Sequence, residues 1–126
     1  MEKLLYIQTE NTPYVNFEIN GFLEIKGKSI PENGYTFFKK IFDWIDEYSK
    51  NPKSETILNI QLDYFNSATS KCLITIFKKL ENIFNNNNNV MIRWFYKKDD
   101  EEIFEAGKDF KSIVKIPFEI IEITQN

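Results

Sequence analysis

The fold is decided in the middle of the chain, where residues 57–71 read ILNIQLDYFNSATSK. Branched and apolar residues dominate from Ile57 to Leu62, which predicts a strand in the interior of a sheet. The segment after Asn66 is rich in Ser and Thr, residues that favour helix starts. Apolar residues at helical spacing follow it, at Leu73, Ile76, Phe77, Leu80 and Phe84. The stretch therefore predicts a strand that turns directly into an amphipathic helix.

Two alternating runs before this unit predict a β-hairpin near Asn20-Gly21. Their apolar positions are Val15, Phe17, Ile19, Leu23 and Ile25. A two-residue turn would mix the apolar and polar faces, so we expect a three-residue loop. That loop pairs Ile19 with Leu23. The same register pairs Phe17 with Ile25.

Three further strands are predicted at residues 4–7, 90–96 and 118–123. One helix is predicted at residues 34–49, after the capping sequence 29–32, and an acidic helix is predicted after residues 99–102. The polyasparagine run 85–89 predicts a solvated connection. Strands joined by helical crossovers lie parallel in one sheet. We therefore expect an α/β fold with a mixed β-sheet, an N-terminal hairpin and helices packed on the sheet, forming a single domain over residues 1–126.

Composition excludes several classes of function. The chain of 126 residues has no His, which excludes Ser-His-Asp catalysis and the usual zinc site, and its single Cys excludes an internal disulfide. The net charge of −3 and the scattered Lys residues disfavour nucleic-acid binding. No stretch has the length of a signal-peptide core or a membrane span. We expect a cytoplasmic protein that has no cofactor and does not bind membranes.

Three hydroxyls, those of Ser67, Thr69 and Ser70, lie where the predicted strand meets the predicted helix. Backbone N–H groups and the positive end of the helix dipole favour an anion at such a turn. A phosphoryl group there adds about −1.5 to −2 charge, enough to reverse docking against a partner surface. Helix capping alone also explains the hydroxyls, and from spacing it is the more common explanation. A constitutive interaction domain and a small nucleotide-binding domain are further alternatives, although P-loop glycines are missing from the sequence.

Two other conspicuous features are explained by structure. The carboxylates of residues 99–102 are consecutive, so on a helix they fan around the axis instead of converging on a metal, and we interpret them as a solvated helix start. Cys72 falls inside an apolar helical pattern, so we interpret it as a core residue.

Residues 62–71, LDYFNSATSK, resemble the signature of the SiaC family of bacterial regulatory phosphoproteins, which are similar to STAS-domain anti-sigma factor antagonists. Five more segments resemble family motifs in their order and spacing: Thr12-Pro13, residues 31–33, residues 43–48, residues 93–96 and residues 117–120. The resemblance covers essentially the whole chain and implies a STAS-like fold.

The resemblance implies a non-catalytic switch. In that family a dedicated kinase phosphorylates the Ser or Thr directly after the Asn of this turn, and a phosphatase removes the group, which makes Ser67 the acceptor. Ala68 stands where a second hydroxyl is usual, and this leaves Thr69 and Ser70 as rivals. The unmodified form would bind and activate a diguanylate cyclase, with anti-sigma-antagonist-like partner switching as the alternative. We expect the partner-binding residues to be Tyr64, Asn66, Ser67, Ala68 and Lys71.

Overall fold

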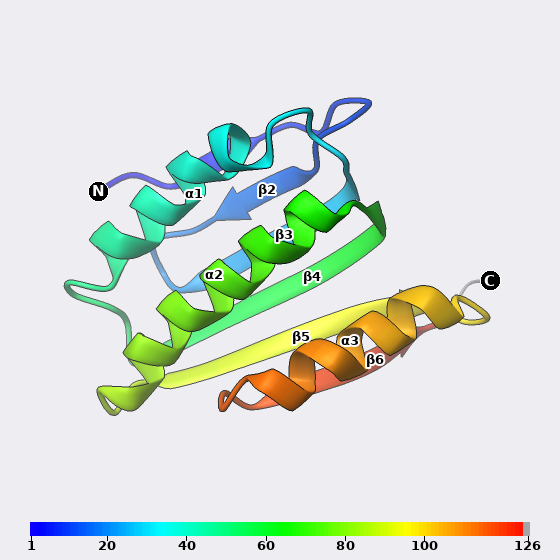
Figure 1. The fold of residues 1–126 in the computed structure, drawn as a ribbon. Coiled ribbons are helices and arrows are strands. Elements are labelled where there is room, and N and C mark those ends of the chain that lie inside the picture. The colour runs from blue at the N-terminus through cyan, green and yellow to red at the C-terminus, as the bar shows by residue number, and fades with distance from the viewer. Residues whose placement is uncertain (125–126) are drawn as a thin grey trace.

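The computed structural model describes residues 1–124, along which six strands and three helices follow one another (Figure 1). Their bounds are β1 Leu4–Tyr6, β2 Tyr14–Phe17, β3 Phe22–Ser29, α1 Gly34–Tyr48, β4 Glu55–Phe65, α2 Ser67–Asn85, β5 Asn89–Lys97, α3 Glu101–Ile113 and β6 Phe118–Ile123. The predicted strand-to-helix unit is confirmed as β4 and α2. The last two residues of the predicted domain, 125–126, lie outside the described residues.

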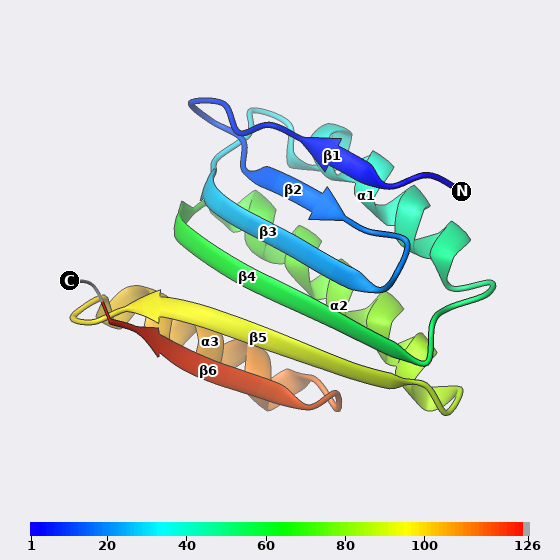
Figure 2. The same ribbon diagram turned by 180° about the vertical axis from the view of Figure 1, so that it is seen from behind.

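The six strands form one sheet in chain order, from β1 to β6. The pairs β1/β2 and β2/β3 are antiparallel, whereas β3 to β6 run parallel, as expected for strands joined by helical crossovers. Each crossover advances to the next strand in the same direction, so a right-handed connection always passes on the same side of the sheet. All three helices accordingly cover one face, and within residues 1–124 none covers the other (Figure 1 and Figure 2). The expected mixed α/β fold is confirmed.

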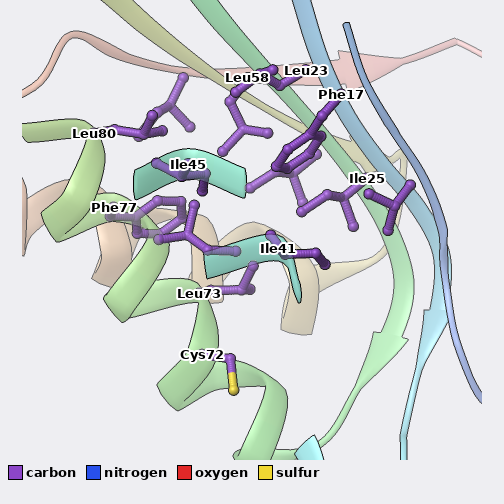
Figure 3. Packing of buried hydrophobic residues seen from close by; sticks show 14 of the residues in the cluster. Phe17, Leu23, Ile25, Ile41, Ile45, Leu58, Cys72, Leu73, Phe77 and Leu80 are labelled. Carbon is purple, nitrogen blue, oxygen red and sulfur yellow. The ribbon is translucent and has the colours of Figure 1, made fainter. Parts of the chain in front are cut away.

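The core lies between the inward face of the sheet and the apolar stripes of α1 and α2 (Figure 3). Buried residues meet there from five elements: Phe17, Leu23, Ile25, Ile41, Ile45, Leu58, Leu73, Phe77 and Leu80. Cys72 of α2 is buried at the border of this cluster, as predicted. Burial raises the pKa of its thiol, because desolvation disfavours the thiolate.

The predicted register of the hairpin is wrong by two residues. β2 ends at Phe17, which pairs with Leu23 instead of Ile25. The reason is Gly21, whose φ of +99° closes a longer loop than expected, between the end of β2 and the start of β3. Ile19 lies in this loop and is 48% exposed instead of pairing with Leu23. Because the shift is an even number of residues, the apolar faces of the two strands still coincide.

The helix α1 begins differently from the prediction. The capping sequence expected at residues 29–32 does not cap it; the N-cap is Asn33, whose Oδ1 accepts a hydrogen bond from the Thr36 N–H at 3.1 Å. Ser29 instead ends β3 with a fully buried side chain. The first strand also ends one residue early, at Tyr6.

Glycine allows α3 to approach the sheet closely. Trp94 of β5 is fully buried, and its indole N–H donates a hydrogen bond to the Ile103 carbonyl of α3 at 2.8 Å. A Cβ placed on Gly107 would lie 2.4 Å from the Trp94 ring. This contact is too short for any residue with a side chain, so the position requires glycine.

Gly107→Ala should lower the free energy of unfolding by about 1–3 kcal/mol, the usual effect of overpacking a core. A loss of stability is informative because alanine forms helices better than glycine by about 1 kcal/mol, so without the Trp94 contact the substitution would stabilise the protein. Denaturant unfolding followed by circular dichroism measures the change. Glu105→Ala, on the exposed face of the same helix, is the control and should change stability by less than about 0.5 kcal/mol. A Gly107→Ala protein as stable as the parent would contradict this packing.

Candidate functional site

The segment from Asn66 to Lys71 forms the turn out of β4 and the first turns of α2. Asn66 is the N-cap: its backbone is extended, and its Oδ1 accepts a hydrogen bond from the Thr69 N–H at 2.9 Å. An amide side chain therefore caps the helix, and the alternative that the hydroxyls act as the cap is wrong. The Ser67 hydroxyl forms no hydrogen bond with any of the described residues.

The three hydroxyls of this segment lie in different environments. Ser67 is exposed and Ser70 is half-buried, whereas Thr69 is fully buried. The Thr69 hydroxyl donates to the Ser29 carbonyl at 3.0 Å, and its Oγ1 lies 2.8 Å from the Ser29 Oγ. A modifying enzyme can reach Ser67 without moving the backbone. It could reach Thr69 only after α2 had separated from the end of β3.

The N-terminus of α1 lies beside that of α2, and the two helices run side by side across the sheet (Figure 1). A Cβ on Gly34 would be 3.0 Å from the Ala68 Cβ, so the two helix starts are in close contact. The Asn66 Nδ2 also donates to the Pro31 carbonyl at 3.5 Å, which ties the α2 cap to the segment that leads into α1. Two positive dipole ends therefore face the region around Ser67, and both favour an anion there.

A groove of about 720 Å³ opens between α1 and α2 at this end of the molecule. The α2 wall includes Ser67, Ala68 and Lys71. The α1 wall includes Tyr35, Lys39, Phe42, Asp43 and Asp46. Tyr35, which lines the groove, is 63% exposed. An exposed aromatic ring beside a hollow of this size is a typical anchor for a protein partner.

The charges of the groove are mostly paired within the protein. Lys39 forms an ion pair with Asp43 at 2.9 Å, and Lys79 forms one with Asp46 at 2.7 Å. The hydrogen bond to Asp43 is the main cause that raises the pKa of Lys39. In the described part of the chain Lys71 forms no ion pair. Its exposed ammonium group is therefore available to an incoming anion.

The structure brings together some of the predicted partner-binding residues and separates one. Ser67, Ala68 and Lys71 share the groove, and Asn66 holds the helix starts beneath it. Tyr64 does not line the groove. It is 54% exposed at the end of β4, beside a smaller hollow of about 210 Å³ that Asp63, Asp100 and Glu102 also line.

The sequence interpretation missed the inward orientation of Thr69, although a signal was present. Thr69 continues the spacing of the apolar stripe formed by Leu73, Ile76 and Leu80, which indicates that it shares their buried face. Its partner Ser29 could not be found in this way, because the two residues are 40 positions apart. The α1 wall of the groove was missed for the same reason.

Within residues 1–124, no three His, Cys, Asp or Glu side chains are gathered in a way that could hold a metal ion. No helix in the same range combines the length and the apolar character needed to cross a bilayer.

The chain as a whole is similar to proteins that are already known. A family profile described as SiaC family regulatory phosphoprotein matches residues 6–123. An uncharacterized protein of Pseudomonas aeruginosa (strain UCBPP-PA14) is 28% identical over 113 residues, which are 89% of this chain and 90% of that protein.

Solved structures from Pseudomonas aeruginosa are also similar. Apo-SiaC is 28% identical with a TM-score of 0.88, over 96% of this chain and 99% of that one. A chain in the crystal structure of the diguanylate cyclase SiaD in complex with its activator SiaC is 27% identical with a TM-score of 0.90, over 95% and 99% of the two chains. The matched span and the shared fold lead to one conclusion: the chain belongs to the SiaC family of regulatory phosphoproteins.

Proposed function

We propose that this chain is a non-catalytic regulator that binds and activates a diguanylate cyclase while Ser67 is unmodified, and that phosphorylation of Ser67 releases the cyclase. A kinase adds the group and a phosphatase removes it, and the exchange takes place in the cytoplasm. The choice of partner is supported by the Pseudomonas aeruginosa complex, in which SiaC is the activator of the diguanylate cyclase SiaD.

The observation that carries the proposal is the contrast between Ser67 and Thr69. Ser67 lines the groove and presents to solvent a hydroxyl that forms no hydrogen bond with residues 1–124, whereas the Thr69 hydroxyl is buried and hydrogen-bonded to Ser29. Ser67 also directly follows Asn66, and it starts a helix whose positive end favours a phosphate. Ser70 is half-buried and does not line the groove, so a phosphate there would act less directly on a bound partner.

Lys71 connects the modification to partner binding. It lies one helical turn after Ser67 on the same side of α2, which is the spacing at which opposite charges attract. A phosphate on Ser67 adds about −1.5 to −2 charge. It would therefore neutralise Lys71 and make this end of the groove acidic. A partner that offers a carboxylate to Lys71 would lose its counter-charge and meet a like charge instead.

Ser67→Asp and Ser67→Glu should weaken binding of the organism's own diguanylate cyclase by about tenfold or more, a loss of at least about 1.4 kcal/mol. Ser67→Ala should bind and activate the cyclase like the parent, because Asn66 caps the helix and Ser67 does not. Isothermal titration calorimetry and the rate of cyclic di-GMP synthesis measure the two effects.

Ser54→Asp is the matched control for added charge, because Ser54 is exposed just before the opposite end of β4. It should leave both measurements unchanged. An acid at the first position of a helix is favourable, so the Ser67 variants should remain folded. If Ser67→Asp and Ser67→Glu bind and activate like the parent, the proposed switch is wrong.

Lys71→Glu should weaken cyclase binding by about tenfold, since the reversed charge removes one attraction and adds a repulsion. The loss should diminish at high salt, which screens exposed charges. Lys115→Glu reverses an exposed charge in the loop after α3 and serves as the control. Equal affinities for the two variants would show that Lys71 has no part in partner binding.

A further inference from the structure

The end of β3 and the first turn of α2 are joined by a pair of buried hydroxyls. Ser29 is the last residue of β3, Thr69 is the third residue of α2, and both are fully buried. Their oxygens lie 2.8 Å apart, and the Thr69 Oγ1 is 3.0 Å from the Ser29 carbonyl oxygen. The same carbonyl accepts the backbone N–H of Asn66 at 3.1 Å.

The positions of the hydroxyl protons follow from these contacts. A carbonyl oxygen can only accept, so the Thr69 hydroxyl donates to the Ser29 carbonyl. The single proton of Thr69 is then used, and the Ser29 hydroxyl donates to the Thr69 Oγ1. Both hydroxyls are thereby satisfied in the interior, where an unpartnered polar group would be strongly unfavourable.

This pair determines which hydroxyl of the segment faces solvent. Successive residues turn by about 100° around an α-helix, so Ser67 and Thr69 point about 200° apart. When Thr69 is held against β3, Ser67 must point outward. If α2 began its first turn in a different register, another hydroxyl of the segment would take the outward position.

We infer that the Thr69 hydroxyl, tied to Ser29 in the interior, is the positioning group that makes Ser67 the phosphate acceptor of this segment. The inference rests on the proposed function. Thr69 acts through the backbone and does not touch the phosphate. The contacts with Ser29 that hold Thr69 in place also bury its hydroxyl, which protects Thr69 from modification.

Three variants separate the tether from simple packing. Thr69→Val keeps the shape but removes the hydroxyl, which leaves Ser29 without its acceptor. The double variant Ser29→Ala with Thr69→Val removes both hydroxyls, so neither position is left with an unpartnered buried hydroxyl and folding is less at risk. Thr69→Ser keeps the hydroxyl and should retain the exchange rates and the Ser67 phosphate of the parent. Ile83→Val, buried at the other end of α2, is the control for a general loss of stability.

Two measurements are made on each variant. The first is hydrogen exchange of the Thr69 and Ser70 amides, which donate hydrogen bonds to the Oδ1 and the carbonyl oxygen of Asn66. The second is the fraction of protein that carries phosphate on Ser67 in the native cells, located by fragment-ion mass spectrometry. Thr69→Val and the double variant should exchange about tenfold faster, the change expected when one such bond is lost. Their phosphate should be depleted at Ser67 or appear at Ser70, whereas Thr69→Ser and Ile83→Val should behave like the parent.

The inference is overturned if the double variant keeps either the exchange rates or the Ser67 phosphate of the parent. It is also overturned if Thr69→Ser fails to rescue, because the effect would then not depend on the hydroxyl. Absence of phosphate from Ser67 in the parent is a different result, which contradicts the proposed function itself. In that case the exchange rates alone decide whether Thr69 positions the start of α2. Unchanged exchange rates would refute that positioning role as well.

Discussion

One buried carbonyl oxygen, that of Ser29, joins the end of β3 to the start of α2 beside Ser67. It accepts hydrogen bonds from the Asn66 N–H and the Thr69 hydroxyl, and so it links the end of β3 to the start of a helix that follows the next strand. Asn66 in turn reaches the segment before α1 through the Pro31 carbonyl. We infer that the outward position of Ser67 depends on this junction.

The two faces of the sheet have different roles. The face without helices carries cross-strand ion pairs, between Arg93 and Glu119 at 3.6 Å and between Lys97 and Asp63 at 3.1 Å. Such exposed pairs contribute little to stability and are typical of a solvated surface. The helix-covered face carries the groove and the N-termini of α1 and α2. In the proposed switch a phosphate on Ser67 would act on Lys71, because the other two lysines of the groove, Lys39 and Lys79, are already paired with Asp43 and Asp46.

Local patterns in the sequence were sufficient to predict the elements and their order, because the periods of strands and helices are properties of short segments. The parallel pairing followed from the crossovers, and the covering of one face follows from their common handedness. The hairpin register could not be predicted, since it depends on the positive φ of Gly21 and on how the loop closes. The extent of the asparagine connection was also overestimated, because α2 continues to Asn85 and β5 begins at Asn89.

The candidate site was predictable only in part. The position of Ser67 came from its motif. Thr69 and Ser70 were left as rivals, although the spacing of the apolar stripe of α2 indicates that Thr69 is buried. The groove was not predictable, because its second wall comes from a helix about thirty residues earlier in the chain. Contacts of this kind arise from topology, which brings the starts of two parallel helices to the same edge of the sheet.

The most direct test of the central claim uses the phosphorylated protein itself. Protein carrying phosphoserine at position 67, made by genetic incorporation, is titrated into the organism's diguanylate cyclase before and after treatment with a phosphatase. The account predicts weak binding and no activation before treatment, with both restored afterwards. Equal affinity and equal activation in the two states would contradict it.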